Sequence, residues 1–331
     1  MTDLISALNE SSKRVNILLD EVLVSRKPDE LYKASKHLVE AGGKRLRPFI
    51  VLKSCQLVGG EVEKALPMAA AVELIHNFTL VHDDIMDEDN KRRGAPTVHV
   101  VYGIPMAINA GDMLFTKAYE VALRSSAIGV PPRRVLQALE ALTEGIVVIC
   151  EGQAMDMSFE KRNNVSEQEY MEMIERKTAA LLVASAKIGA IVGNASKREV
   201  AHLCHAMRAT GLAFQIVDDV LGVTAEENVL GKPVGSDIRE GKRTLITHHS
   251  LKHAGKQQRN IIMKALGKKE ASPETIKSAI EVLKSTGSID YALKKAEVFT
   301  IKAKSELEAF QSSDTRDLLI SLVDYIVTRD R

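Results

Sequence analysis

Two clusters of aspartates have the residue types and spacing best suited to chemistry. The first places five carboxylates in the seven positions from Asp83 to Asp89, directly after an apolar helical run. Asp83 and Asp87 are spaced to share one helical face, where like charges repel by roughly 0.2 to 0.5 kcal/mol. A hard cation such as Mg²⁺ would offset that repulsion and complete its shell with substrate phosphates. The alternative is a solvated acidic helix end.

The second cluster strengthens the metal interpretation. Asp218 and Asp219 again end an apolar helical run, and a basic, glycine-containing segment again follows. We expect the two helix ends to face one another, with a metal-bridged diphosphate between them.

Three basic segments accompany these clusters, at residues 42–48, 91–94 and 231–244. Their glycines would let backbone amides approach phosphate, and their Lys and Arg side chains would supply charge. None has the spacing of a nucleotide-binding P-loop. Each segment alone could be a solvated surface loop, but three of them around two acidic helix ends favour a diphosphate site.

The chain must position these groups with helices. A proline-free stretch at residues 133–232 is rich in helix-forming residues, and apolar residues between Ile289 and Phe310 recur at spacings of three and four. Ser272-Pro273 and Gly287-Ser288 mark helix starts. No alternating β-branched run predicts a sizeable sheet. We therefore predict an all-α fold of about ten or more helices, with residues 1–331 forming a single domain around a central cavity.

Composition excludes several other classes of protein. The 45 Lys and Arg residues nearly balance the 44 Asp and Glu residues, so no global field favours nucleic acid or an anionic membrane. The three cysteines, Cys55, Cys150 and Cys204, form no disulfide framework or CxxC pair, and we expect them to be buried small residues. The sequence predicts no export signal and no membrane span, hence a cytoplasmic protein.

The ordered series of motifs resembles the trans-prenyltransferases, the isoprenyl diphosphate synthases of the all-helical isoprenoid synthase fold. The motifs are GGKRLRP at 42–48, DDxxD at 83–87, RRG at 92–94, GQxxD at 152–156, KT at 177–178, FQxxDD at 214–219 and GKxxGxDxxxGKxT at 231–244. Together they resemble archaeal-type geranylgeranyl diphosphate synthases most closely. The resemblance also implies a homodimer.

The resemblance implies a Mg²⁺-dependent condensation of isopentenyl diphosphate with allylic diphosphates of five to fifteen carbons. Three aspartates would hold about three Mg²⁺ ions: Asp83, Asp87 and Asp218. Four cations would complete the oxygen shell of the allylic diphosphate: Arg92, Lys177, Lys232 and Lys242. A second set would bind isopentenyl diphosphate: Lys44, Arg47, His76 and Arg93. Further carboxylates would orient water, metal or cations: Asp84, Asp156, Asp219 and Asp237.

The expected chemistry is consistent with these assignments. Breaking the allylic carbon–oxygen bond produces a carbocation and free diphosphate, so positive charge must gather on the leaving group while water is excluded. Gln215, the Thr178 hydroxyl and the Lys177 carbonyl would face the carbocation, which dipolar oxygens steady without capturing. The proton lost afterwards goes to the departing diphosphate, so no dedicated base is required.

One position departs from the family pattern. The second motif is usually DDxxD, but this chain has Gly222 at its last position, which argues against a metal ligand there. Two carboxylates remain, and we interpret the glycine as a subtype marker.

Product length depends on the helix that precedes Asp83, because each residue upstream lies about 1.5 Å further down the cavity. Phe78 stands five residues before Asp83 and would form the cavity floor. Its position resembles the pattern of synthases with a C20 product. A farnesyl or longer polyprenyl product is the alternative, as is a simple packing role for Phe78.

Other functions remain as alternatives. Paired ExxH motifs, Glu73–His76 and Glu199–His202, would suit a di-iron oxidoreductase, but that leaves the aspartate clusters unexplained. A terpene cyclase would not need the second diphosphate site. A non-catalytic regulatory subunit would not need both acidic clusters.

Overall fold

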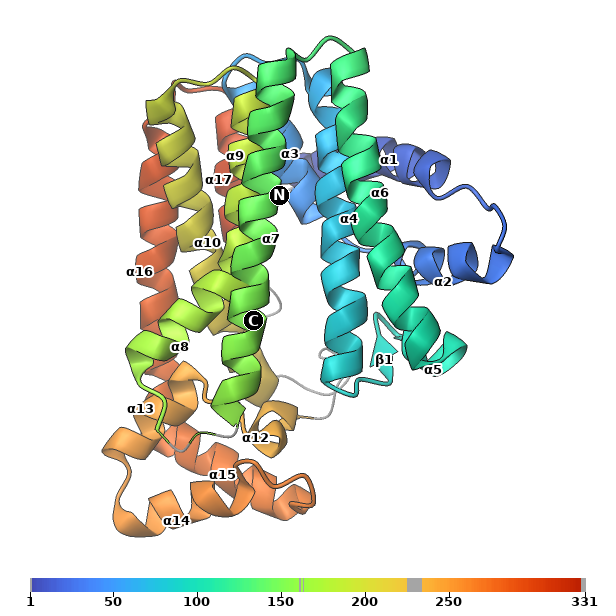
Figure 1. The fold of residues 1–331 in the computed structure, drawn as a ribbon. Coiled ribbons are helices and arrows are strands. Elements are labelled where there is room, and N and C mark those ends of the chain that lie inside the picture. The colour runs from blue at the N-terminus through green and yellow to red at the C-terminus, as the bar shows by residue number, and fades with distance from the viewer. Residues whose placement is uncertain (1, 161, 163, 225–233, 329–331) are drawn as a thin grey trace. The chain divides into compact units, whose positions relative to one another are not determined.

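The computed structural model describes residues 2–160, 162, 164–224 and 234–328, and these are almost entirely helical. The predicted all-α class is confirmed (Figure 1). No helix among the described residues is both long and apolar enough to cross a membrane. The elements in the first part of the chain are α1 (Thr2–Val22), α2 (Asp29–Glu40), α3 (Leu46–Leu57), α4 (Val62–Met86), β1 (Lys91–Arg92), β2 (Ala95–Pro96), α5 (Val98–Tyr102), α6 (Ile104–Ala127) and α7 (Pro132–Glu160). The remaining elements are α8 (Glu167–Ile174), the π-helical turn η1 (Glu175–Ala179), α9 (Ala180–Val192), α10 (Lys197–Thr224), α12 (Ser236–Glu240), α13 (Leu245–His253), α14 (Lys256–Ala265), α15 (Pro273–Ser285), α16 (Ser288–Glu308) and α17 (Asp314–Val327).

The chain forms two compact units, which are described separately. Unit 1 comprises Met1–Ile146, Leu181–Cys204 and Leu307–Leu322. Unit 2 comprises Val147–Ala180, His205–Glu306 and Val323–Arg331.

The core of unit 1 is built around α4. Every residue from Met68 to Ile75 is buried, Glu73 included, so this helix is covered on all sides where it passes through the core. It packs most extensively against α6, beside which it runs in Figure 1, and next against α3. The last turn leaves the core and ends at Met86, and the backbone N–H of the next residue, Asp87, donates to the Asp83 carbonyl. A buried helix therefore carries the first acidic cluster.

A tight hairpin follows this acidic end. Lys91 pairs with Pro96 and Arg92 with Ala95 in two antiparallel strands. The two turn residues, Arg93 and Gly94, have φ angles of 54° and 78°, as a two-residue type I′ turn requires. This hairpin is the whole sheet content of the described residues, in agreement with the prediction of no sizeable sheet.

Unit 2 contains the predicted helix starts of the C-terminal third. The Ser272 side chain accepts a hydrogen bond from the Thr275 backbone N–H, and Pro273 is the first residue of α15. Gly287, with a φ of 66°, separates α15 from α16, which begins at Ser288. Both predicted starts are confirmed.

The expectation for the cysteines is wrong in part. Cys55 is buried, but Cys204 is only partly buried and Cys150 is exposed. On α7 the buried face includes Ile146 and Ile149, and the next residue along a helix turns about 100° away from its neighbour. Cys150 consequently lies on the outer face.

Candidate active site

The acidic end of α4 is tied to the hairpin by one arginine. Arg92 donates from Nε to Asp84 Oδ1, and its Nη2 atom lies 3.7 Å from Asp83 Oδ2 and 3.5 Å from Asp89 Oδ2. Asp84 is only 1% exposed, and burial raises its pKa to about 6 although Arg92 opposes that shift. Asp84 Oδ2 has no hydrogen-bond partner within the described part of the chain. Asp84 therefore fixes the position of the Arg92 side chain, and its orienting role in catalysis stays a prediction.

A cationic cluster lies at the start of α3 in the same unit. Arg47 Nη1 is 3.1 Å from His76 Nε2 on α4. Arg93 Nη1 donates to the Gly42 carbonyl, and a Cβ on Gly43 would lie 3.0 Å from the Arg93 guanidinium. Three predicted isopentenyl diphosphate residues thus gather around the GGKRLRP loop. The fourth, Lys44, is exposed on that loop.

The environment of His76 favours the neutral imidazole. Burial lowers its pKa well below the usual value, and Arg47, Arg93, Arg92 and Arg45 lower it further. This histidine therefore offers a neutral N–H donor and does not take up a proton itself near neutral pH.

We expect the His76 pKa shift to make stability fall in mild acid. Below about pH 6.5 the unfolded state takes up a proton that the folded state refuses, so the free energy of unfolding falls by up to about 1.4 kcal/mol per pH unit. Denaturant unfolding between about pH 7 and pH 5 measures the His76 contribution as the difference in slope between wild type and His76→Asn, because Asp84 and Asp219, with pKa values raised to about 6 and about 7, add an opposite dependence in the same range. An unchanged slope in His76→Asn would contradict the assignment.

Arg45 is a residue of this loop that the sequence analysis did not single out. Its Nη1 atom lies 2.7 Å from Glu73 Oε1, and both side chains are almost fully buried. Its other nitrogens donate to Asn16 Oδ1 at 3.0 Å and to the Val39 carbonyl at 2.8 Å. The Arg45 side chain therefore holds α1, α2 and α4 to the loop.

The same contacts weaken the di-iron alternative. Glu73 is engaged by Arg45, and Glu199 accepts hydrogen bonds from the Ser196 backbone and hydroxyl at the start of α10. Among the described residues, no group of three or more His, Cys, Asp or Glu side chains is arranged to hold a metal ion. Both ExxH glutamates thus have structural roles.

Phe78 lies one and a half turns before Asp83 on α4. Its ring makes edge contacts with His82 at 4.8 Å and with Phe115 of α6 at 5.4 Å, measured between ring centroids. These contacts fix an aromatic side chain upstream of the acidic end. Its role as a cavity floor stays a prediction.

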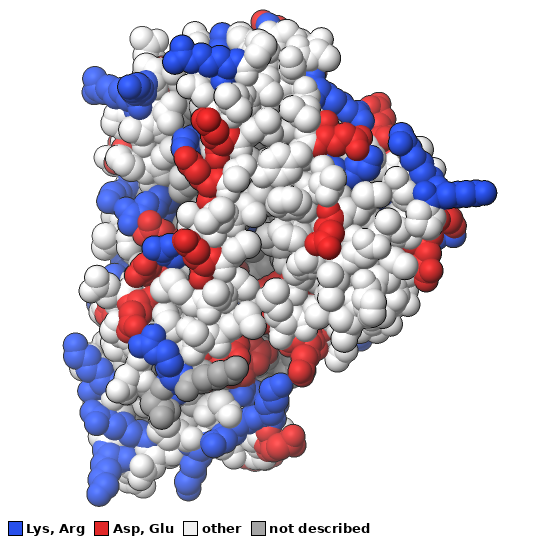
Figure 2. Space-filling model, in the orientation of Figure 1, with Lys and Arg blue, Asp and Glu red and all other residues white. Residues whose placement is uncertain are grey.

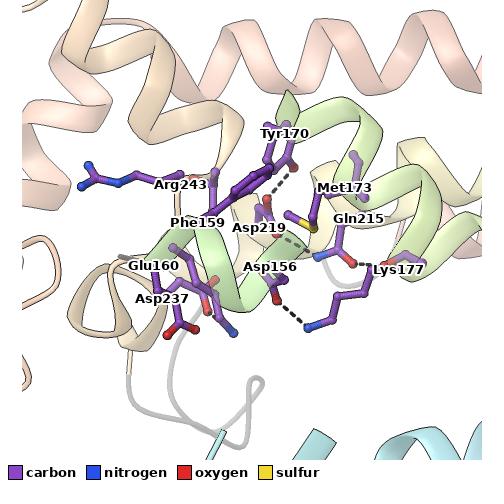
Figure 3. A pocket seen from close by; sticks show the side chains of 14 residues that line it. Asp156, Phe159, Glu160, Tyr170, Met173, Lys177, Gln215, Asp219, Asp237 and Arg243 are labelled. Atoms are coloured by element: carbon purple, nitrogen blue, oxygen red, sulfur yellow. Dashed lines mark hydrogen bonds and ion pairs between the residues drawn. The ribbon is translucent and has the colours of Figure 1, made fainter. Parts of the chain in front are cut away.

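Unit 2 contains a pocket whose lining includes most of the other predicted residues, although Asp218 is not among them. It is lined by segments of α7, α8, η1, α10 and α12 and by the loop before α13. Figure 3 shows Asp156, Lys177, Gln215, Asp219 and Asp237 around it.

A chain of hydrogen bonds runs along one wall of this pocket. The Thr178 hydroxyl donates to Gln215 Oε1 at 2.7 Å, and Gln215 Nε2 donates to Asp219 Oδ1 at 2.9 Å. The fully buried Tyr170 donates from its hydroxyl to Asp219 Oδ2 at 2.6 Å. Burial and the charge of Asp237 raise the pKa of Asp219 to about 7, against the effect of these two donors.

The turn carrying Lys177 and Thr178 is π-helical. Lys177 Nζ lies 2.6 Å from Asp156 Oδ2 of α7 (Figure 3). A Cβ on Gly152 would overlap the Lys177 backbone, and one on Gly211 would lie 2.5 Å from Ala179 Cα. Glycines on α7 and α10 thus allow both helices to press against η1, where π-helical turns often mark functional sites.

Gly222 also has a packing role. A Cβ there would lie 2.9 Å from Asp237 Oδ2, so the glycine leaves room for that carboxylate. Lys242 Nζ lies 3.7 Å from Asp237 Oδ1 and 3.0 Å from Glu240 Oε2. Asp237 and Lys242 are therefore brought together. Lys232 lies outside the described residues.

The two aspartate clusters belong to different units. Asp83, Asp84 and Asp87 lie in unit 1, whereas Asp218 and Asp219 lie in unit 2. Their convergence stays a prediction.

Comparison with known proteins decides the family. Residues 28–283 match the family model described as polyprenyl synthetase. The chain belongs to the polyprenyl synthetase family. Within it, the chain is 47% identical over 304 residues to the geranylgeranyl diphosphate synthase of Sulfolobus acidocaldarius, covering 92% of this chain and 91% of that one. It is 44% identical over 330 residues to a short chain isoprenyl diphosphate synthase of Methanothermobacter thermautotrophicus, covering 100% of both.

Solved structures of polyprenyl synthetases agree with this assignment. The crystal structure of geranylgeranyl pyrophosphate synthetase from Pyrococcus horikoshii matches with a TM-score of 0.93 and 44% identity, covering 99% of each chain. The family resemblance predicted from the motifs is therefore confirmed.

Proposed function

We propose that this prenyltransferase condenses isopentenyl diphosphate head to tail with allylic diphosphates and releases geranylgeranyl diphosphate. The observation that carries this is the unit 2 pocket, where the Lys177 ammonium neighbours the neutral oxygens of Thr178 and Gln215. A cation stabilises the negative charge of the leaving diphosphate, and dipolar oxygens stabilise the carbocation that remains. We further propose that the whole chain acts as one catalytic domain.

The carboxylates fit Mg²⁺ shared with a diphosphate. Mg²⁺ usually takes one or two protein carboxylates, and its remaining ligands are water and phosphate oxygens. Asp83 and Asp87 offer such a pair one turn apart, beside buried Asp84, whose Oδ2 atom has no hydrogen-bond partner among the described residues. We propose that Asp83, Asp87 and Asp218 hold the Mg²⁺ ions. Bound Mg²⁺ would neutralise charge that develops on the leaving diphosphate.

The chain's own cations would complete the diphosphate site. Arg92 is held by Asp84, and Lys177 by Asp156, so each cation has a buried or partly buried carboxylate that fixes its direction. We propose that these two bind the allylic diphosphate together with Lys242 and Lys232. Such preorganised cations need little rearrangement as the bond to carbon breaks.

The GGKRLRP loop would hold the second substrate. Arg47, Arg93 and Lys44 supply positive charge there, and neutral His76 supplies a donor for a phosphate oxygen. Binding orients the isopentenyl double bond toward the carbocation. The proton released after bond formation passes to the diphosphate, so the protein needs no general base.

The decisive experiment combines the purified chain, Mg²⁺ and labelled isopentenyl diphosphate with C5, C10 or C15 allylic diphosphates in turn. We expect labelled C20 product from each partner after phosphatase treatment and chromatography of the alcohols. Termination at C15 or beyond C20 would overturn the product assignment alone. Absence of isopentenyl incorporation with every partner would overturn the proposed reaction, and cyclic hydrocarbons would indicate a terpene cyclase.

Product length should respond to Phe78. Phe78→Ser removes the ring that packs on Phe115, so the proposed floor is lowered and the product should extend beyond C20. Chromatography of the released alcohols measures the shift. Phe299→Ser, a half-buried aromatic change on α16, serves as the control and should leave the chain length unchanged. An unaltered product in Phe78→Ser would mean that the ring only fills space.

We propose that the enzyme is a homodimer joined through α5 and α6. Large apolar side chains are exposed there: Val100 and Val101 at 48% each, Ile104 at 52% and Ile108 at 44%. An exposed apolar patch of this kind marks an interaction surface. Sedimentation equilibrium measures the assembly, and a monomer at all concentrations would contradict it. The cytoplasmic location stays a prediction.

A further inference from the structure

Positive charge is concentrated in one part of unit 2. Residues 252–284, here called the basic layer, contain eight Lys and Arg residues but three Asp and Glu residues, whereas the whole chain has a net charge of +1. The layer includes α14 and α15, and Figure 2 shows Lys and Arg side chains gathered over this region. Overall neutrality therefore conceals a strong local field.

The exposed face of α14 carries much of this charge. Ile262, Ala265 and the following Leu266 are buried, and α14 packs extensively against α15. The exposed positions on the other side of the helix include Lys256, Lys264 and Met263, which is 44% exposed. A helix with cations around an exposed apolar side chain suits a headgroup layer.

Three lysines of this surface have no carboxylate partner in the part of the chain that the structure describes. Lys256, Lys264 and Lys268 are exposed and form no ion pair with another described residue. In contrast, Arg259 is engaged with the Ala254 and Lys252 carbonyls. The three lysine charges are therefore available to an external anion.

The basic layer contacts the loop that carries Lys242 of the pocket. The Gly267 backbone N–H donates to the Ile238 carbonyl at 2.9 Å, and a Cβ on Gly241 would lie 3.0 Å from Gly267 Cα. The turn after α14 thus packs directly on the α12 segment. A partner bound to the layer would lie beside an element of the diphosphate site.

We propose that the basic layer binds the surface of a bilayer containing anionic phospholipids. This rests on the proposed function, because a C20 diphosphate is an amphiphile whose hydrocarbon chain partitions into lipid. Each lysine near an anionic surface contributes attraction that corresponds to about a fivefold change in affinity. The layer has no Phe, Tyr or Trp on which nucleic acid bases could stack.

The test uses the full-length chain and sedimentation of sucrose-loaded vesicles. One set contains only phosphatidylcholine, and the other contains about one third phosphatidylglycerol. We expect binding to the anionic vesicles alone, lost in about 0.5 M NaCl because salt screens exposed charges. Equal binding to both sets, or none to either, would overturn the proposal.

A matched pair of triple variants locates the surface. Lys256→Glu/Lys264→Glu/Lys268→Glu should weaken binding by about a hundredfold or more. The control, Lys13→Glu/Lys27→Glu/Lys197→Glu, changes net charge equally at exposed lysines elsewhere and should retain most of the binding. Equal losses in the two triples would show a response to net charge only, against the proposal.

Activity without vesicles separates this inference from the proposed function. Both triples should condense substrates at the wild-type rate in solution, since no substituted lysine belongs to the diphosphate site. A wild-type chain that forms no product would refute the reaction itself. The membrane proposal would be wrong if the active enzyme did not bind anionic vesicles. It would also be wrong if the enzyme bound duplex DNA more tightly than those vesicles in the same buffer.

Discussion

Arg45→Met should lower the free energy of unfolding by about 3–5 kcal/mol, the largest stability effect expected in unit 1. The substitution removes the ion-pair partner of Glu73, whose carboxylate is 2% exposed and accepts from Arg45 at 2.7 Å, and leaves it the Asn77 amide at 3.3 Å. An uncompensated buried carboxylate must either remain charged in a poor solvent or take up a proton. The contacts with Asn16 and the Val39 carbonyl are lost as well. Denaturant unfolding with a fitted m-value measures the change.

Two further variants isolate the cause of that loss. Arg14→Met breaks the surface contact with Glu63, which is 76% exposed, and should cost less than about 1 kcal/mol. Arg45→Met/Glu73→Leu removes both buried charges and should recover much of the stability that Arg45→Met loses. A loss in Arg45→Met no greater than in Arg14→Met would show that the buried pair is unimportant.

Asp218→Asn should reduce the turnover rate by about a thousandfold, which corresponds to roughly 4 kcal/mol of transition-state stabilisation. Under the proposed function, the substitution removes an anionic ligand from a Mg²⁺ ion that neutralises the leaving diphosphate. Initial rates of isopentenyl incorporation at saturating substrate measure the loss. The Mg²⁺ concentration for half-maximal rate should rise at the same time, which a general structural defect would not produce.

The matched control is Asp290→Asn, an equal charge change at an exposed position in the first turn of α16. It should leave the rate and the Mg²⁺ dependence unchanged. If Asp218→Asn kept its rate within about tenfold of wild type at ordinary Mg²⁺ concentrations, the metal role of Asp218 would be wrong.

Much of the fold follows from local patterns in the sequence. The start of α15 could be predicted because a capping hydroxyl and a first-turn proline act within a few residues of each other. The polyprenyl synthetase family could be predicted because its motifs keep their order along the chain. Lys177 and Asp156, which the structure pairs, both belong to motifs that can be read directly from the sequence, whereas their catalytic roles stay predictions.

Other features depend on contacts that no local pattern reveals. Tyr170 precedes Asp219 by 49 positions, and its type and spacing resemble those of any core aromatic residue. The π-helical turn at Lys177 depends on close approach by helices bearing Gly152 and Gly211, far away in the sequence. Arg45 belongs to the GGKRLRP motif, whereas its buried partner Glu73 belongs to an ExxH motif, and nothing in the spacing of the two motifs predicts their contact. In each case a long-range contact decides the role.

The buried carboxylate of Asp219 determines which groups donate and which accept along the hydrogen-bonded wall of the pocket. In its ionised form it can only accept, so the Gln215 amide must turn its NH₂ group inward and receive the Thr178 proton on its oxygen. The lone pairs of the Thr178 hydroxyl oxygen then remain available to an electron-poor carbon of the substrate. An amide at position 219 could donate to Gln215 instead of accepting from it. The direction of the hydrogen bonds from Thr178 through Gln215 could then reverse, and the Thr178 hydroxyl would point its hydrogen toward the positively charged carbon of the substrate.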